Sequence, residues 1–388
     1  MTRSTQFQHD CVVVGASFAG LACAHALAGA GLRVAVYEQK GDPGEKLHTT
    51  GIIVKDAIDQ IALLDDLPAQ LVRRISGVRL YAPNLRHVDL AAPGYYFLAT
   101  DTPNVMRWLA GRAEEAGARL HCGQVFREAH RQRSGFDLGE LGQTRFLVGA
   151  DGPNSRVARA LGLGQNSRYL FGIEYEYASV DIDEPDKLHC FISRRLARGY
   201  IGWVAHGVGV VQVGLARRLR GQAPPPREAM AAFLERIAPI FDFRAMRPSS
   251  VRAGKIPCGG LVRGVAAQRA LLVGDAAGMV SPVTAGGIHT ALKHGLAAGH
   301  AIADYLAGKR EDPSGWFVDS YPRFRAKRLL RFLFDHFQSD TAFNLLLATS
   351  PMRRAAGLVY FHHKGVFDPA IVADSRSPAD RSAIVRSG

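Results

Sequence analysis

The stretch that decides the fold reads Asp10-Cys11-Val12-Val13-Val14-Gly15-Ala16-Ser17-Phe18-Ala19-Gly20, and Val34-Ala35-Val36-Tyr37-Glu38 closes it. Its run Cys11 to Gly15 is apolar and stops at a glycine, which is typical of a strand buried on both faces of a parallel sheet. The following Ala19 to Ala30 is rich in Ala and Leu and predicts a helix. A second apolar strand is expected over Arg33 to Tyr37. The stretch therefore predicts a βαβ unit.

Small residues and one acid in this unit favour a dinucleotide. Gly15 allows a tight strand-to-helix turn, and the helix start offers N–H donors and a positive dipole end to a pyrophosphate. Ser17 stands where the usual pattern has glycine, and it is small and can donate a hydrogen bond. Glu38, 23 residues after Gly15, suits a ribose with a free 2′-OH, as in FAD or NAD. A plain βαβ turn is the alternative, because a glycine-rich turn alone is a weak signal.

A second segment reads Leu271-Leu272-Val273-Gly274-Asp275-Ala276-Ala277-Gly278, followed by Pro282 and Gly286-Gly287-Ile288. Asp275 offers a carboxylate to sugar or ribityl hydroxyls at the end of a short strand. The glycines open a predicted helix that runs through Ala301 and beyond, whose first N–H groups can face an electron-rich flavin edge. The alternative is a capped helix after a core strand.

A third element, Thr144 to Arg156, is a predicted strand that runs into a turn. Its Asp151 and Gly152 come at the carboxyl end of the strand, where doubly wound sheets bind ligands. The same Asp-Gly pair is also an ordinary turn.

These three elements, in this order, resemble the FAD-dependent oxidoreductases that include the class A aromatic hydroxylases and the geranylgeranyl reductases. The resemblance covers roughly residues 8 to 330. It implies an α/β fold like that of para-hydroxybenzoate hydroxylase. In that fold a Rossmann-type FAD-binding domain is interleaved with a β-sheet substrate domain, and C-terminal helices follow.

The motifs and the resemblance together predict a set of FAD contacts and no metal site. The five cysteines are scattered and show no metal-ligand spacing. The expected cofactor contacts are Gly15, Ser17, Phe18, Ala19, Gly20, Glu38, Gln39, Lys46, Thr50, Val125, Asp151, Gly152, Gly274, Asp275, Ala276, Pro282, Gly286, Gly287 and Ile288.

Two reactions fit the resemblance. Gly278, where hydroxylases more often carry histidine, and Pro43-Gly44-Glu45-Lys46 favour a reductase that reduces C=C bonds of an apolar small molecule. The reductases, however, usually carry cysteine where this chain has Thr49-Thr50. A flavin monooxygenase that hydroxylates an aromatic or polyketide substrate is therefore the alternative. NADPH, NADH or an electron-donor protein would supply the electrons.

Three residues of the middle region are expected to contact substrate. If Tyr200, Trp203 and His206 lie on one strand, Tyr200 and His206 share a face and Trp203 points the opposite way. His206 and, in the loop after the first unit, His48 are weak candidates for a catalytic acid or base. Core packing of Trp203 and a structural role for His206 are the alternatives.

Composition limits the partners and the location. The net charge of +13 allows attraction to phosphates or anionic lipid, but no nucleic-acid motif accompanies it, so nucleic acid is not an expected partner. No apolar run reaches 18 residues, and the first ten residues are polar, so a cytoplasmic protein is expected. Residues 321–334 are basic and amphipathic. They predict peripheral contact with the inner membrane face, or a helix that packs its apolar face on the FAD domain with its arginines outward.

The predicted domains are interleaved along the chain. An FAD-binding domain is expected from 1–75, 100–165 and 263–312, and a substrate domain from 76–99 and 166–262. A helical region over 313–373 and a disordered tail over 374–388 complete the prediction.

Overall fold

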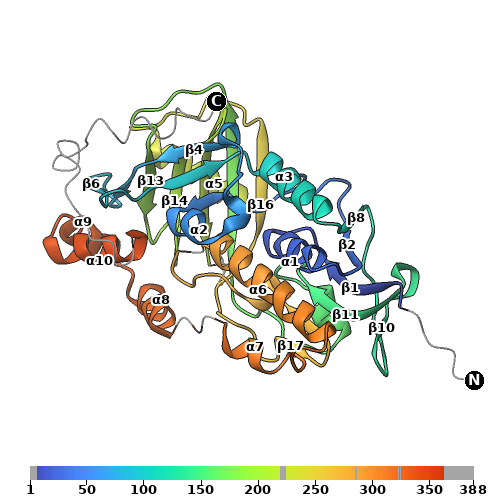
Figure 1. Cartoon of the computed structure of the whole chain (residues 1–388). Helices are drawn as coiled ribbons and strands as arrows, with labels where there is room; N and C mark the ends of the chain where they lie inside the picture. The colour runs from blue at the N-terminus through green and yellow to red at the C-terminus, as the bar shows by residue number, and fades with distance from the viewer. Residues whose placement is uncertain (1–6, 219–223, 285, 322, 324, 362–388) are drawn as a thin grey trace, which may run out of the picture.

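Three β-sheets and the helices around them form the molecule in the computed structural model, which describes residues 7–218, 224–284, 286–321, 323 and 325–361 (Figure 1). The described residues end before the predicted tail 374–388. The mixed α/β architecture confirms the predicted fold class. Among these residues, none of the helices combines the length and the apolarity needed to span a bilayer.

The first sheet gathers all three motifs at one edge. Its strand order is β17-β18-β11-β1-β2-β8, and the run from β18 to β8 is parallel. The carboxyl ends of β18, β11, β1 and β2 therefore meet at one edge of the sheet. The bounds are β1 (His9–Val14), β2 (Val34–Glu38), β8 (Arg119–Cys122), β9 (His130–Gln132), β10 (Gly135–Asp137), β11 (Gln143–Gly149), β17 (Ala266–Ala267) and β18 (Ala270–Leu272).

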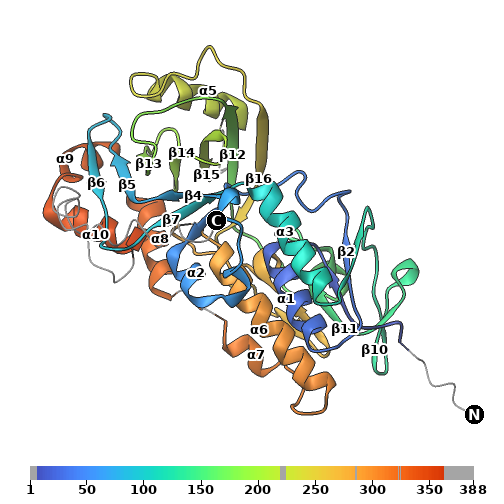
Figure 2. The same ribbon diagram turned by 45° about the horizontal axis from the view of Figure 1, so that its top comes forward.

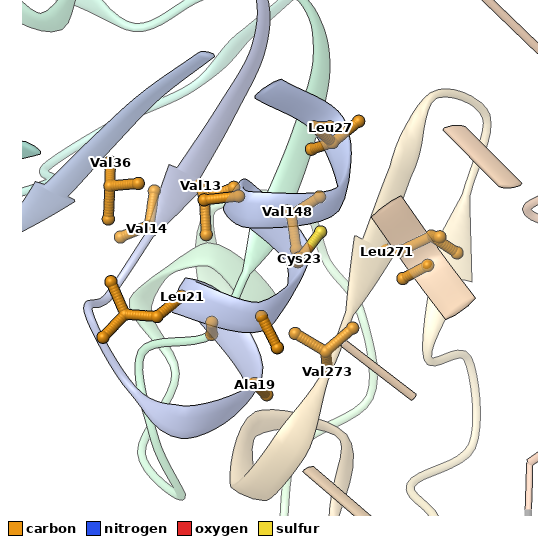
Figure 3. Packing of buried hydrophobic residues seen from close by; sticks show 14 of the residues in the cluster. Val13, Val14, Ala19, Leu21, Cys23, Leu27, Val36, Val148, Leu271 and Val273 are labelled. Carbon is orange, nitrogen blue, oxygen red and sulfur yellow. The ribbon is translucent and has the colours of Figure 1, made fainter. Parts of the chain in front are cut away.

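Helices cover this sheet and bury its apolar side chains. Figure 3 shows side chains of β1, β11 and β18, such as Val13, Val148 and Leu271, gathered with Cys23 and Leu27 of helix α1. The helix begins directly after Ser17, whose hydroxyl accepts a hydrogen bond from the Gly20 N–H at 3.2 Å. The main helices of this layer are α1 (Phe18–Gly29), α3 (Thr102–Glu115) and α6 (Ile288–Leu306), and short α4 (Arg156–Ala160) follows β11.

Helices α1 and α6 approach each other closely because α6 carries glycine at their contact. A Cβ atom at Gly295 would lie 2.3 Å from the carbonyl oxygen of Ala19, and one at Gly299 would lie 2.6 Å from that of Cys23. No side chain fits at these distances. The two glycines of α6 therefore allow the backbones of the two helices to pack against each other and fix the position of α1.

We expect Gly295→Ala to lower the free energy of unfolding by about 3 kcal/mol, because the two helices must separate to admit one methyl group. Urea unfolding followed by circular dichroism measures the change. The matched control is Gly111→Ala in α3, where a Cβ would meet nothing within 4 Å. That variant should gain up to about 1 kcal/mol from helix propensity. Equal effects of the two substitutions would contradict the close-contact explanation.

The second sheet is mostly antiparallel, with the order β16-β12-β15-β14-β13-β5-β6. Helix α5 (Pro226–Ile237) covers one face and buries Met230 and Phe233 against Val211 and Val213 of β15. The opposite face is left for the cavity described below. The bounds are β5 (Gly77–Tyr81), β6 (His87–Leu90), β12 (Tyr169–Ala178), β13 (Lys187–Ile192), β14 (Ile201–His206), β15 (Val210–Arg217) and β16 (Ser250–Pro257).

A third, small sheet was not foreseen from the sequence. The predicted substrate-domain segment 76–99 divides, because β7 pairs with β3 and β4 rather than with β5 and β6. Alternation of apolar and polar residues indicates a strand but does not say which sheet it joins. The bounds are β3 (Ile52–Val54), β4 (Val72–Ile75) and β7 (Phe97–Thr100), and helix α2 (Lys55–Gln60) follows β3.

Helices α9 and α10 pack beside the second sheet, whereas α7 packs on the core of the first sheet through Phe317. Figure 2 shows α9 and α10 next to β5 and β6, far from the N-terminus, and Phe361 of α10 is buried with Val78 of β5. The expectation that the arginines of this region point outward is wrong for Arg331, which is buried, whereas Leu329 and Phe332 are exposed. The bounds are α7 (Trp316–Asp319), α8 (Arg325–Phe337), α9 (Asp340–Leu346) and α10 (Ser350–Phe361).

Candidate functional site

A single cavity of about 1240 Å³ joins the three parts of the fold. Its walls are the carboxyl edge of the first sheet, the free face of the second sheet, and helices α8 to α10. Pockets for drug-sized ligands usually measure about 300–1,000 Å³. The cavity is therefore large enough to hold a cofactor and a substrate together.

Most of the predicted cofactor contacts line one part of this cavity, which we call the cradle. The lining residues from the prediction are Gly15, Ser17, Phe18, Ala19, Glu38, Gln39, Lys46, Thr50, Asp151, Gly152, Gly274, Asp275, Gly286, Gly287 and Ile288. They come from segments as far apart in the chain as Gly15 and Ile288, and the parallel sheet brings the strand ends together at one edge.

Gly20, Val125, Ala276 and Pro282 do not line the cavity. A Cβ at Gly20 would lie 2.1 Å from the Gly15 carbonyl oxygen, so this glycine serves close packing of helix on strand. Val125 lies between Gln124 and Phe126, which do line the cavity. Successive side chains of an extended segment point to opposite sides, which explains why these neighbours line the cavity and Val125 does not.

The turn after β1 is shaped for a close ligand. Gly15 has φ +102°, a conformation that side chains rarely adopt, and a Cβ there would lie 2.5 Å from the Ala150 carbonyl oxygen. Ser17 donates to that same carbonyl oxygen at 2.9 Å while it caps α1. Serine thus replaces the usual glycine with a residue that ties two strand ends together. The helix start remains open to the cavity and fits a pyrophosphate.

Glu38 organises the next loop of the cradle. Its Oε2 accepts a hydrogen bond from the Ala16 N–H and its Oε1 accepts one from the Lys40 N–H, both at 2.9 Å. Each carboxylate oxygen can accept a further bond, which suits the two hydroxyls of a ribose. Two backbone donors also fix its orientation before any ligand binds.

Asp151 has a structural role that its position alone did not reveal. Its carboxylate accepts from the hydroxyl of Ser155 and the N–H of Arg156, both at 2.6 Å, and from the N–H of Val157 at 3.1 Å. It therefore holds the start of α4. Burial is the main cause of its raised pKa, and these hydrogen bonds oppose the rise.

Asp275 is the most unusual group of the cradle. Burial raises the pKa of its carboxyl to about 6, although the side chain is partly accessible from within the cavity. Its carboxylate has no hydrogen-bond donor among the described residues. Its Oδ1 faces Gly287, where a Cβ would lie 3.7 Å away. An unsatisfied carboxyl beside a glycine at the start of α6 fits the hydroxyls of a polyol chain, so the cradle fits FAD.

A polar cluster on the second sheet lies beside the cradle and was missed from the sequence. Glu174 of β12 is 4% exposed and lines the cavity. Its Oε2 accepts hydrogen bonds from the Thr50 hydroxyl at 2.6 Å and from the indole N–H of Trp203 at 2.8 Å. Its Oε1 has no hydrogen-bond partner among the described residues, and Arg252 Nη1 is 3.9 Å away.

The charges around Glu174 come from two strands. Arg252 of β16 also pairs with Glu176 Oε1 at 2.7 Å and donates to the Thr49 carbonyl oxygen at 3.0 Å. Burial is the main cause of the raised pKa of Glu174, and it outweighs the opposing effect of its two hydrogen bonds and of Arg252. Two glutamates at positions i and i+2 within a strand were a sequence signal that could have been used.

The predicted substrate contacts divide differently from the expectation. Tyr200 lies just before β14, so the strict alternation of side chains along the strand does not apply to it. Tyr200 and Trp203 both line the cavity, and their ring centroids are 6.5 Å apart. His206, predicted to share a face with Tyr200, does not line it. Burial and then Arg73 lower the pKa of His206. His48 does line the cavity, and its side chain packs against Gly254 of β16.

The rest of the cavity is apolar, and we call it the apolar compartment. It lies between the second sheet and the C-terminal helices. Its lining includes Leu80, Leu188, Ile192, Leu330, Leu333, Phe334, Phe337, Phe343, Leu347, Met352, Ala356, Val359 and Tyr360. The cavity thus leads from a polar cradle to a hydrocarbon-like space.

Comparisons with known proteins identify one family and a set of similar reductases. Residues 8–332 match the model of a family described as FAD binding domain. The sequence is 30% identical to digeranylgeranylglycerophospholipid reductase 2 of Methanopyrus kandleri, with 81% of each chain covered. It is also 30% identical to the reductase 2 of Methanothermobacter thermautotrophicus, over 82% of this chain and 84% of that one.

Two solved structures illustrate the fold. A geranylgeranyl bacteriochlorophyll reductase-like protein from Thermoplasma acidophilum has a TM-score of 0.75 at 18% identity, over 94% of this chain and 98% of the other. The p-nitrophenol 4-monooxygenase of Pseudomonas putida has a TM-score of 0.69 at 15% identity, over 92% and 98%. At these identities the likeness concerns the fold alone.

Proposed function

Since the chain belongs to the FAD binding domain family and is an FAD-dependent oxidoreductase, we propose that it reduces C=C bonds in an apolar, prenyl-type small molecule. The family membership confirms the resemblance that the three motifs indicated. Relatives named digeranylgeranylglycerophospholipid reductases support the reaction and the kind of substrate.

The observation that carries the proposal is the continuity of the cavity. One end is a cradle with the features that a flavin dinucleotide needs, and the other is the apolar compartment under α8 to α10. A long hydrocarbon chain can enter that compartment with its double bonds directed toward the cradle. Apolar lining of this extent favours a hydrocarbon over a polar substrate.

The residues that would hold FAD follow from the cradle. The open start of α1 with Gly15 and Ser17 takes the pyrophosphate, and Glu38 takes the ribose hydroxyls. Asp275 takes hydroxyls of the ribityl chain, and the N–H groups at the start of α6 face the ring. When bound, and once reduced by its electron donor, the flavin would supply the hydride for one carbon of the double bond.

The second carbon of the double bond needs a proton, and Glu174 can supply it. Because its Oε2 is already held by Thr50 and Trp203, a proton on this carboxyl belongs on Oε1. Burial favours the protonated form, and the group lines the cavity next to the cradle. One hydride and one proton convert C=C to CH–CH, and Glu174 regains its proton from solvent afterwards.

The test is anaerobic. The purified protein is reduced with NADPH, NADH or dithionite and mixed with digeranylgeranylglycerophospholipid in detergent micelles. We expect the flavin to reoxidise and the lipid to gain two hydrogens per double bond by mass spectrometry. A product that requires oxygen and carries one added oxygen atom would instead establish the monooxygenase alternative, for which the fold shared with p-nitrophenol 4-monooxygenase speaks. The reductant that works identifies the electron donor, and failure of both nicotinamides favours a donor protein.

Peripheral membrane contact through residues 321–334 forms part of the proposal, and the surface of the C-terminal helices supports it. Elsewhere among the described residues, the exposed large apolar side chains are Met246 and Val251. On α8 to α10 they are Leu329, Phe332, Leu345, Leu346 and Leu358, together with Leu330, Leu333 and Phe337, which also line the cavity. Arg325 and Arg328, which are exposed on α8, suit an anionic bilayer.

We expect the protein to float with phosphatidylglycerol vesicles in a density gradient and to bind pure phosphatidylcholine vesicles less. A Leu329→Ser/Phe332→Ser variant should lose most of this binding, because each side chain contributes about 1.5–3 kcal/mol when buried in lipid. Met246→Ser is the control, since that side chain is exposed on another part of the protein. Unchanged flotation of the double variant would exclude this surface.

A further inference from the structure

A buried arginine lies where the cradle meets the apolar compartment. Arg331 of α8 is 4% exposed and lines the cavity. Its Nη1 donates to the carbonyl oxygen of Pro282 at 3.3 Å, and its Nη2 is 3.0 Å from Asp335 Oδ1. Its Nε has no hydrogen-bond partner among the described residues. A buried guanidinium group with an unsatisfied donor is costly.

The surrounding charges do not balance. Asp335, one turn along α8, also pairs with Arg218, whose Nη2 is 2.6 Å from Asp335 Oδ2. The side chains of Arg331, Arg218 and Asp335 are 5%, 10% and 10% exposed. Two buried guanidinium groups therefore share one carboxylate. Burial is the main cause of the lowered pKa of Arg331, and Arg218 adds to it.

The cluster is held in place by both neighbouring parts of the fold. Gln338, on the turn after α8, accepts a hydrogen bond from the Gly199 N–H at 2.9 Å, and Tyr200 donates to the Thr284 carbonyl oxygen beside it. The positive charge is thus fixed between the second sheet and the loop before α6. It is a prepared site rather than a side chain free to turn to solvent.

We propose that Arg331 binds the anionic headgroup of an amphiphilic substrate whose hydrocarbon chain fills the apolar compartment. Neighbouring residues on α8, namely Leu330, Leu333 and Phe334, line that compartment. The charge of Arg331 therefore lies at the edge of the space that a hydrocarbon chain would fill. A phosphate or carboxylate group would supply the negative charge that the two guanidinium groups lack. The inference rests on the proposed function only in taking this cavity as the substrate site.

The test measures binding without turnover. Calorimetric titrations of the oxidised protein compare dodecyl phosphate with dodecyltrimethylammonium, which has the same chain and the opposite charge, below their micelle concentrations. We expect the wild-type protein to prefer dodecyl phosphate by roughly tenfold or more. Arg331→Gln should abolish the preference, Arg331→Lys should retain part of it, and Arg227→Gln, at an exposed position of α5 outside the cavity lining, should keep it in full.

The binding results for Arg331 can be interpreted independently of the C=C reduction test. Equal affinity for the two amphiphiles, or a preference that survives in Arg331→Gln, overturns the inference while leaving C=C reduction intact. Inorganic phosphate that binds as tightly as dodecyl phosphate overturns the amphiphile assignment. If Arg331→Gln fails to fold, as judged by circular dichroism, the Arg331→Lys variant decides: a preference for dodecyl phosphate, reduced or full, supports a cation site, and no preference overturns it. A protein that keeps the preference but reduces no lipid contradicts the proposed function alone.

Discussion

Replacing Asp275 with asparagine is expected to weaken FAD binding by roughly tenfold to a hundredfold and to stabilise the FAD-free protein at neutral pH. Without ligand, the Asp275 carboxylate has no hydrogen-bond donor among the described residues, and burial raises its pKa to about 6. Asparagine removes that buried charge. It also removes the strong acceptor that the ribityl hydroxyls would use, so stability and affinity move in opposite directions.

The pH dependence of this effect has a definite sign. The folded state holds the Asp275 proton up to about pH 6, whereas the unfolded chain releases it near its ordinary pKa of 3.8. The stabilising contribution of the protonated group is therefore complete at low pH and is lost as the pH rises from about 4 to about 6. Partial accessibility reduces the cost of ionisation to the order of 1–2 kcal/mol.

Urea unfolding of the apoprotein at pH 5 and pH 7, with FAD titration by flavin fluorescence, measures both quantities. Asp89→Asn is the matched control. Burial acts to raise the pKa of Asp89, but hydrogen bonds from Arg79 and Lys187 prevail and lower it to about 2. Its loss should destabilise the protein at pH 7 and leave FAD affinity unchanged, since it lies outside the cavity lining. A destabilised Asp275→Asn apoprotein would contradict the reasoning.

The second large effect is expected from Glu174→Gln, which should lower lipid reduction by roughly a hundredfold or more while FAD still binds. Glutamine keeps the shape of the side chain, and its amide oxygen can accept from Thr50 and Trp203 as Oε2 does. It cannot deliver a proton. In the wild-type protein, reduction should fall as the pH rises through the raised pKa of Glu174, because the proton is then lost.

A readout other than turnover separates this role from a structural one. The Trp203 indole donates to Glu174, so its fluorescence in the apoprotein should titrate with this carboxyl and cease to do so in Glu174→Gln. Other charges that face the group are Arg252 and Glu176, and Glu176→Gln is the control. Glu176 lies outside the cavity lining, so that variant should keep most of the turnover. Equal losses in both variants would mean that the cluster acts only as structure.

The site residues that could be predicted from the sequence were those whose role depends on neighbours close to them in the chain. The turn at Gly15, the acid at Glu38 and the late Asp275 were predictable, because each follows a strand directly and its chemistry is set by a few neighbours. Val125 and Pro282 were predicted in the right segments but at positions that do not line the cavity. Sequence patterns indicate segments more reliably than side-chain directions.

Features assembled by distant segments could not be predicted in this way. Glu174 gains its meaning from Thr50 and Trp203, which β14 and the loop before β3 bring to it. Arg331 was counted with a solvent-facing basic surface, because an amphipathic pattern cannot show that Asp335 and Arg218 bury one of its arginines. Tyr200 was assigned to the wrong face because β14 begins one residue later.

The far wall of the cavity is made by α8 to α10, a continuous segment at the end of the described chain, whereas the cradle is built from segments spread over residues 14–291. Under the proposed function, one wall of the substrate space is thus encoded apart from the residues of the cradle. Bulky substitutions at Met352, Ala356 or Val359 would shorten the space available to a hydrocarbon without touching the flavin contacts. Substitutions in these helices can therefore change the length of hydrocarbon chain that fits the cavity, while the residues that hold the flavin stay the same.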